Sequence, residues 1–126
     1  MRLILGGRAQ GKRAYVQNTY KIRAEEFRAG ETEAFEELRE QRAFDSFHLW
    51  VRRKYEEGAE VMELTKRLLA ANPDCIILCD EVGCGIVPLE HAEREYRELV
   101  GRVQILLAER AVSVERIICG ISQKIK

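Results

Sequence analysis

The chain has 126 residues, with 21 lysines and arginines against 21 aspartates and glutamates, so its formal net charge is zero. This length predicts one domain with one core, and a composition of 46% hydrophobic and 33% charged residues excludes a disordered chain and a membrane protein. The balanced charge also argues against a general nucleic-acid or membrane-surface binder, because such proteins carry a cationic excess that holds phosphates.

The first half of the chain predicts a short strand followed by helical segments. Leu3-Ile4-Leu5 is an apolar run that ends abruptly at two glycines, which indicates a short buried strand. Residues 12–23 allow a helix, and residues 31–42 form a glutamate-rich helical pattern with Gly30 before it as a breaker. Residues 44–57 carry a helical stripe, but their first residues also fit the end of a very short strand, so both interpretations stay open.

The second half predicts two helices and two further strands. An amphipathic helix follows Gly58 and ends near Pro73. Residues 75–79 form a continuous apolar run, which is typical of a strand buried on both faces of a parallel sheet. A long helix, with Pro88 at its first position, precedes a last strand over residues 114–119. This alternation predicts an α/β fold with a small, mainly parallel sheet flanked by helices.

A phosphate loop is predicted between the first strand and the first helix. Residues 6–12 match G-x-x-x-x-G-K in the strand–loop–helix context that the motif requires. Glycines let backbone N–H groups converge on phosphate oxygens, and the helix N-terminus adds positive potential. Lys12 then contacts the β- and γ-phosphates of a nucleotide; the alternative is a glycine-rich turn with a solvated lysine. The candidate nucleotide-binding residues are Gly6, Gly7, Arg8, Ala9, Gln10, Gly11, Lys12 and Arg13, within a single P-loop NTPase-like domain over residues 1–126.

Arg13 departs from the motif at the position after the lysine. Phosphate loops carry Ser or Thr there because the hydroxyl coordinates Mg²⁺, and an arginine cannot ligate a cation. Arg13 either binds a phosphate itself and partly replaces the metal, or it marks a loop that binds nucleotide poorly or no longer catalyses. Residues 1–23 carry six basic residues and no acidic one, whereas residues 25–40 carry seven glutamates. This contrast favours a local anion site.

Carboxylates follow two of the predicted strands. Asp80 and Glu81 come directly after an apolar run, at the edge where open α/β sheets bind ligands. Asp80 is the candidate metal ligand, because such a carboxylate holds Mg²⁺, often through water. Asp45 is a third carboxylate candidate, and solvated strand ends or helix caps are the structural alternative. His48 and His91 are the two histidines; both lie in helical patterns, and we expect structural or surface roles for them.

The cysteines point to a reducing compartment. They form no C-x-x-C pair, and two of them lie in the apolar run of residues 75–79, which favours buried thiols over a disulfide or a metal site. No apolar run approaches the roughly 20 residues that span a bilayer, and the first apolar stretch is too short for a signal peptide. We therefore expect a cytoplasmic protein with no membrane partner and no nucleic-acid partner. The four cysteines are Cys75, Cys79, Cys84 and Cys119.

Several segments resemble the bifunctional adenosylcobinamide kinase / adenosylcobinamide-phosphate guanylyltransferase family of cobalamin biosynthesis. The most specific match is Asp80-Glu81-Val82-Gly83-Cys84-Gly85-Ile86-Val87-Pro88, which looks like the family's N-E-V-G-x-G-I-V-P signature. Residues 94–103 and 119–126 are similar to later family stretches, and residues 6–12 are similar to its T-G-G-A-R-S-G-K-S loop. Residues 45–51 resemble the family segment whose leading Asp or Glu contacts the nucleotide.

The resemblance implies a function and a set of roles. ATP or GTP would donate phosphate to the aminopropanol hydroxyl of adenosylcobinamide, so a nucleotide and a cobinamide are the implied partners. Lys12, Glu81 and Asp45 would be the catalytic residues, with the two carboxylates placing metal or substrate. Family members assemble as oligomers, so a homo-oligomer is implied.

The middle of the chain departs from the family pattern. Upstream of the segment that resembles residues 45–51, the family has a second strand and a helix with H-x-x-x-R-P-x-x-W, whose histidine becomes guanylylated. Residues 24–43 contain no histidine, proline or tryptophan. The chain therefore looks like a shortened member without the strand-and-histidine insert, and guanylyltransferase activity is not expected.

Three functions stay open at this point. The first is a kinase acting on a cobinamide-type alcohol, the second is a nucleotide-binding regulator or partner subunit without turnover, and the third is a scaffold with a degenerate phosphate loop. The retained Gly6, Gly11, Lys12 and Glu81 favour the first two functions, whereas Arg13 and the short middle favour the last two.

Overall fold

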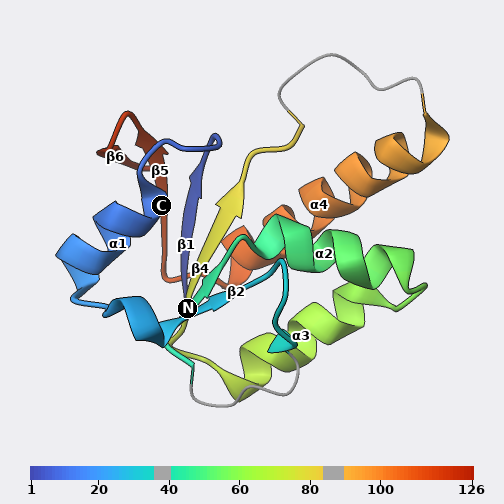
Figure 1. The fold of residues 1–126 in the computed structure, drawn as a ribbon, viewed down its shortest axis with the longest axis horizontal. Helices are drawn as coiled ribbons and strands as arrows, with labels where there is room; N and C mark the ends of the chain where they lie inside the picture. Colours follow the sequence, from blue (N-terminus) through green and yellow to red (C-terminus); the bar gives the residue numbers. More distant parts are fainter. Residues whose placement is uncertain (36–40, 84–89) are drawn as a thin grey trace.

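The fold is an open six-stranded sheet with helices against both of its faces (Figure 1). The computed structural model describes residues 1–35, 41–83 and 90–126. In chain order the elements are β1 (Arg2–Gly6), α1 (Lys12–Tyr20), the 3₁₀ turn η1 (Ala24–Glu26), β2 (Phe27–Ala29), β3 (Ala43–Asp45), α2 (Phe47–Glu56), α3 (Val61–Ala71), β4 (Ile76–Asp80), α4 (His91–Arg110), β5 (Ser113–Ile118) and β6 (Ile121–Lys124).

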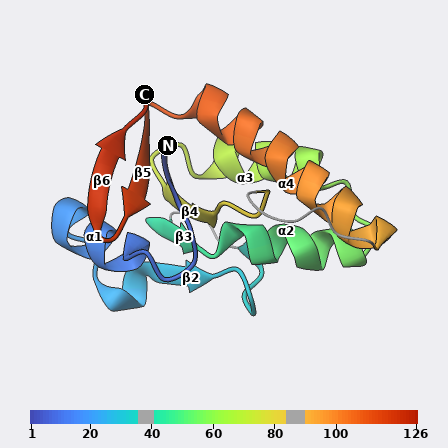
Figure 2. The same cartoon turned by 90° about the horizontal axis from the view of Figure 1, so that it is seen from above.

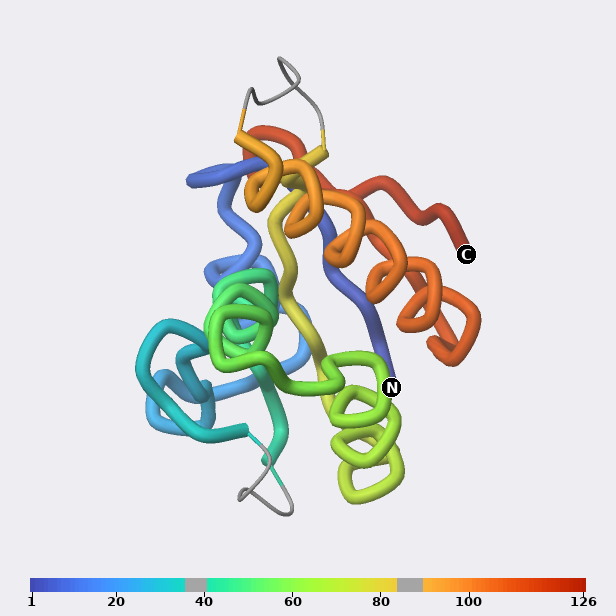
Figure 3. The backbone as a smooth tube through the Cα atoms, turned by 90° about the vertical axis from the view of Figure 1, so that its right-hand side faces the viewer, coloured from blue at the N-terminus to red at the C-terminus, as the bar shows by residue number. Residues whose placement is uncertain are grey.

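The strands lie in the order β2-β3-β4-β1-β5-β6. All neighbouring pairs from β2 to β5 are parallel, and β6 is antiparallel to β5. β1 and β4 run side by side through the middle of the molecule (Figure 3). The predicted α/β class with a mainly parallel sheet is therefore confirmed. Because the chain leaves β1 in one direction toward β2 and later returns to its other side at β5, the carboxyl ends of β1 and its neighbours form the crevice where such sheets bind ligands.

Apolar side chains fill the space on both sides of the sheet, because successive residues of a strand point to opposite faces. Ile77 belongs to the cluster that α2, α3 and α4 cover, whereas Ile76 and Leu78 belong to the cluster that Val16 of α1 covers. Figure 2 shows α1 on the opposite side of the sheet from α3 and α4. The predicted strand at residues 75–79 is thus buried on both faces, as expected.

The predicted helix over residues 31–42 is wrong where the structure describes it. Residues 31–35 form turns and a bend with no α-helix, and residues 36–40 lie outside the described residues. Phe35 lies in a buried aromatic cluster, where its ring stacks on Trp50 with centroids 5.7 Å apart. Similarly, α1 ends at Tyr20 and not at residue 23, because Lys21 adopts a left-handed conformation with φ 55°.

Residues 24–43 contain a strand, β2, that was not predicted from the resemblance to the family pattern. β2 pairs in parallel with β3, so the expectation of a chain without this strand is wrong. Gly30 follows β2, and its backbone N–H donates to the carbonyl of Asp45 at 2.9 Å. A Cβ at Gly30 would lie 2.2 Å from the Ser46 carbonyl oxygen. Gly30 is therefore required for this close approach, and it does not act as the breaker before a helix.

The remaining predicted elements are confirmed with small shifts. Residues 43–45 form the short strand β3, and residues 47–56 form the helix α2. The strand interpretation is therefore confirmed for the start of this segment and the helix interpretation for the rest. The fully exposed edge strand β6 was not predicted. Pro88 lies outside the described residues, and α4 is described from His91. No helix among residues 1–35, 41–83 and 90–126 is long and apolar enough to cross a membrane.

Candidate functional site

The loop between β1 and α1 connects a buried strand to a helix, as a phosphate loop does. β1 ends at Gly6 and α1 begins at Lys12. Gly11 caps the helix with φ 91°, a conformation that glycine adopts without steric cost. A Cβ at Gly6 would lie 2.6 Å from the Ile117 carbonyl oxygen, so glycine also lets β1 approach β5 here. The sequence therefore places its glycines where the backbone must turn sharply or pack closely.

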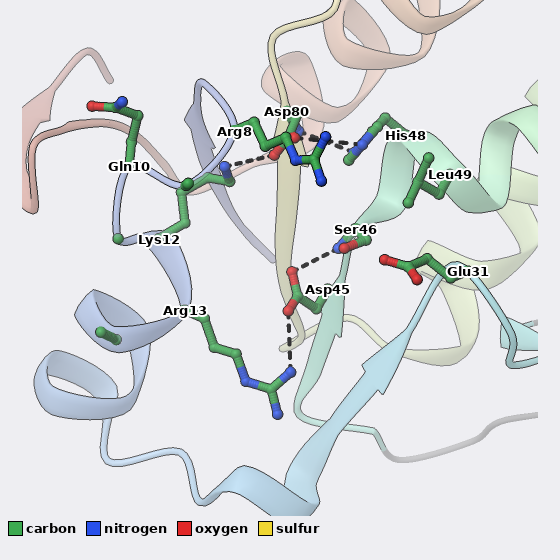
Figure 4. Close-up of a pocket in the computed structure, with 13 residues that line it drawn as sticks. Arg8, Gln10, Lys12, Arg13, Glu31, Asp45, Ser46, His48, Leu49 and Asp80 are labelled. Carbon is green, nitrogen blue, oxygen red and sulfur yellow. Dashed lines mark hydrogen bonds and ion pairs between the residues drawn. The ribbon is translucent and has the colours of Figure 1, made fainter.

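This loop forms one wall of a cavity of about 720 Å³. The other wall comes from the end of β3, the start of α2 and the end of β4, so the cavity lies at the carboxyl ends of parallel strands (Figure 4). Six of the predicted nucleotide-binding residues line it, together with both predicted aspartates. The lining residues are Arg8, Ala9, Gln10, Gly11, Lys12, Arg13, Ala14, Glu31, Asp45, Ser46, His48, Leu49 and Asp80.

Lys12 is buried and bound within the site. Its ammonium donates to the carbonyls of Gly6 at 3.3 Å and Gly7 at 2.7 Å, and it lies 2.6 Å from Oδ1 of Asp80. The side chains of Lys12 and Asp80 are 9% and 18% exposed, so this ion pair is largely removed from water. A phosphate entering the loop therefore competes with Asp80 for the lysine.

His48 contacts the backbone N–H and the second carboxylate oxygen of Asp80. Its Nδ1 accepts a hydrogen bond from the Asp80 backbone N–H at 3.3 Å, and its Nε2 lies 3.5 Å from Oδ2 of the same residue. Burial lowers the pKa of His48 below its ordinary value, Asp80 opposes this effect, and the nearby Lys12 reinforces it. A neutral imidazole also fits the Nδ1 acceptor role. His48 is thus a buried residue of the cavity wall, not a surface residue.

Arg13 pairs with the second aspartate. Its Nη1 lies 3.3 Å from Oδ2 of Asp45, and its Nη2 donates to the carbonyl of Ala24 at 3.3 Å. The guanidinium also stacks over the Phe27 ring, 4.4 Å from the centroid. The remaining Asp45 oxygen accepts the Ser46 backbone N–H at 2.7 Å. Arg13 therefore ties the start of α1 to β2 and β3.

Gln10 connects the loop to the β5–β6 turn. Its side-chain oxygen accepts the Cys119 backbone N–H at 2.8 Å, and its backbone carbonyl accepts the Gly120 N–H at 2.8 Å. These two bonds fix the loop from the side opposite to Asp45. Cys119 is exposed, contrary to the expectation of buried thiols, whereas burial raises the pKa of Cys75 and Cys79 to about 12.

The two neighbouring carboxylates Asp80 and Glu81 separate in space. Glu81 forms a bidentate pair with Arg116 of β5, with Oε1 at 2.9 Å from Nε and Oε2 accepting Nη2 at 3.1 Å. It is not among the residues that line the cavity. The predicted roles of Asp80 as metal ligand and of Glu81 as catalytic residue stay predictions, but Asp80 alone of the two faces the loop.

Sequence reasoning missed five lining residues, which are Ala14, Glu31, Ser46, His48 and Leu49. Three of them follow β3 within a few positions, and residues directly after a parallel strand line the ligand crevice. That signal was present at Asp45 and could have been extended to Ser46 and His48. Glu31 carried no such signal, because β2 is only three residues long.

The donor set at the loop does not suit a divalent cation. All four carboxylate oxygens of Asp45 and Asp80 have a partner in Arg13, Ser46, Lys12 or His48 within 3.5 Å. In the described part of the chain, no three His, Cys, Asp or Glu residues lie together as they would to hold a metal ion. The residues present therefore do not fit the Mg²⁺ that a phosphate loop ordinarily implies.

Comparison with known proteins identifies relatives. The family model "cobinamide kinase / cobinamide phosphate guanyltransferase" matches residues 23–125. The bifunctional adenosylcobalamin biosynthesis protein CobU of Escherichia coli K12 is 35% identical over 69 residues, which are 55% of this chain and 38% of the relative. The CobU protein of Salmonella typhimurium LT2 is 40% identical over 63 residues, or 47% of this chain and 35% of the relative.

The family match and the phosphate loop are independent observations, because the match begins at residue 23, after the loop. The aligned regions span little more than a third of the length of these two relatives. The family model nevertheless matches most of this chain, residues 23–125. With its P-loop NTPase-like sheet and the loop of residues 6–13, the chain belongs to the cobinamide kinase / cobinamide phosphate guanyltransferase family.

Proposed function

We propose that this protein binds ATP or GTP in the cavity at the phosphate loop and transfers the terminal phosphate to the hydroxyl of a cobinamide. The observation that carries the proposal is the position of Lys12, which lines the cavity at the start of α1 and pairs with Asp80 at 2.6 Å. Family membership supports a nucleotide and a cobinamide as ligands. By the family resemblance, we further propose a homo-oligomer in the cytoplasm.

The proposed reaction assigns a part to each side chain around Lys12. The backbone N–H groups of the loop cradle the phosphates, and Lys12 exchanges Asp80 for a phosphate oxygen. Asp80, released from the lysine but still beside His48, is then the carboxylate available to accept the proton of the attacking hydroxyl. Guanylyltransferase activity is not part of the proposal, because residues 24–43 contain no histidine.

A second candidate function is nucleotide binding without turnover. The pairing of Arg13 with Asp45 favours it, because one of the two carboxylates near the loop is then engaged in a structural contact. In that case the protein acts as a regulator or partner subunit that senses nucleotide.

Calorimetric titration with ATP and with GTP tests the proposal. We expect binding by the wild type and a loss of at least about tenfold in affinity for Lys12→Met, since a hydrogen bond to a charged group contributes about 1.5–3 kcal/mol. Lys66→Met is the matched control, because Lys66 is exposed on α3 beside Glu63. Thermal unfolding of each variant verifies that it is folded.

Each outcome selects one function. Phosphate transfer to adenosylcobinamide that Lys12→Met abolishes supports the kinase. Binding without transfer leaves the nucleotide sensor. No binding of either nucleotide, or binding that Lys12→Met leaves unchanged, rejects the loop as a nucleotide site and leaves a scaffold.

A further inference from the structure

We infer that this site binds the nucleotide without a divalent cation held by the protein, because the ion pair of Arg13 with Asp45 replaces the metal site. The inference rests on the proposed nucleotide binding and specifies its cation requirement. It follows from the side chains that surround the loop.

Arg13 occupies the position at which phosphate loops present a metal-binding hydroxyl. Its guanidinium is fixed by Asp45, the Ala24 carbonyl and the Phe27 ring. Its side chain is still 47% exposed, and it lines the cavity. A permanent cation thus stands within reach of the ligand, and no side-chain oxygen is available at this position.

The carboxylates that would complete a metal site are engaged as well. Asp45 is neutralised by Arg13, and Asp80 by Lys12. These two cations are consecutive residues at the start of α1, and the two aspartates end neighbouring strands, β3 and β4. A divalent cation at Asp45 would have to displace Arg13 from its ion pair. A divalent cation at Asp80, which the proposed reaction releases from Lys12, would still be repelled by the nearby charges of Lys12 and Arg13.

Three basic residues of the cavity supply the positive charge that a metal ordinarily supplies to the phosphates of a nucleotide. Arg8, Lys12 and Arg13 all line the cavity, and a guanidinium binds phosphate oxygens through paired hydrogen bonds. Mg²⁺ on the triphosphate reduces its negative charge, and so it weakens the attraction to these groups. We therefore expect the metal-free nucleotide to bind at least as tightly as its Mg²⁺ complex.

Titrations of ATP and GTP in EDTA and in excess Mg²⁺ test this inference on the whole chain. For the wild type, the dissociation constants under the two conditions are expected to agree within about threefold, or to favour EDTA. Arg13→Ser restores a hydroxyl and frees Asp45, so Mg²⁺ is expected to tighten binding by at least about tenfold. Arg13→Lys keeps the charge, so the ratio of its dissociation constants in EDTA and in Mg²⁺ is expected to stay within about threefold.

Arg67→Ser is the matched control, because Arg67 is an exposed arginine on α3 and is not part of the cavity lining. Wild-type binding that weakens tenfold in EDTA overturns the inference and leaves nucleotide binding intact. Equal Mg²⁺ responses in Arg13→Ser and in either Arg13→Lys or the control overturn it too, because the fixed charge at residue 13 would not be the cause. No binding under either condition rejects the proposed function itself, and this inference with it.

Discussion

The pKa of His48 reports on the electrostatics of the cavity. Burial, the negative charge of Asp80 and the positive charge of Lys12 all act on its imidazole. The residue is 8% exposed. Burial is the largest effect on its pKa and lowers it, Asp80 raises it, and Lys12 lowers it. The folded-state pKa of His48 is therefore below the value near 6.5 that an imidazole has in the unfolded chain.

This difference predicts how stability depends on pH. Between the folded-state pKa and about 6.5, the unfolded chain binds more protons than the folded chain, so the free energy of unfolding falls as the pH drops through this range. One proton limits the slope to about 1.4 kcal/mol per pH unit. Above this window the contribution of His48 is constant, and the protein is at its more stable level.

Urea unfolding between about pH 5 and pH 7.5 measures the slope. His48→Gln removes the titrating group, and the slope in this range is expected to disappear. His91→Gln is the matched control, because His91 is the second of the two histidines and lies exposed on α4 beside Glu95. The reasoning is refuted if His48→Gln keeps the wild-type slope, or if stability rises as the pH falls, since Asp80 would then govern the imidazole.

The charge on Lys12 can be separated from burial in the same experiment. Lys12→Met removes one of the causes that lower the pKa of His48, so the imidazole titration followed by NMR is expected to move to higher pH. An unchanged titration would show that Lys12 is too well screened to act on His48.

Four further substitutions test the scaffold by urea unfolding. Phe35→Ala removes a ring that is fully buried among aromatic side chains and is expected to cost about 3–5 kcal/mol; a cost below 1 kcal/mol would mean that the ring does not pack there. Gly30→Ala sets a methyl group against the Ser46 carbonyl and is expected to cost about 1–3 kcal/mol, whereas Gly101→Ala, with open space around it, should stabilise by up to about 1 kcal/mol. Gln10→Ala loses the side-chain bond to the β5–β6 turn and is expected to cost about 0.5–1.5 kcal/mol; no change would show that this bond does not hold the loop.

The elements predicted from the sequence are those with a strong local signal. The strands at residues 3–5 and 75–79 are continuous apolar runs, because both of their faces are buried in a parallel sheet. β2 has three residues and β6 is fully exposed, so neither shows an apolar pattern. Both strands exist because a neighbouring strand pairs with them, and the sequence does not encode pairing partners locally.

The predicted helix over residues 31–42 is wrong at residues 31–35 for a similar reason. Its apolar residues are spaced as on a helix, but Phe35 is buried against Phe44, Phe47 and Trp50, which come from β3 and α2. Tertiary contacts of this kind override local propensity. The spacing alone therefore indicated the burial of Phe35 correctly and the backbone conformation of residues 31–35 wrongly.

The sequence by itself determined the glycine-rich loop of residues 6–13, since the glycines, Lys12 and Arg13 belong to one short segment and the backbone conformation of the loop depends on its glycines directly. Tertiary structure decided which distant side chains meet it. Asp80 and Glu81 are adjacent in sequence, but Asp80 faces Lys12 whereas Glu81 pairs with Arg116, because successive positions at the end of a strand point in different directions. The partners of Lys12 and Arg13 likewise come from strands far away in the chain, so the ion pairs that define this site exist only once the sheet has formed.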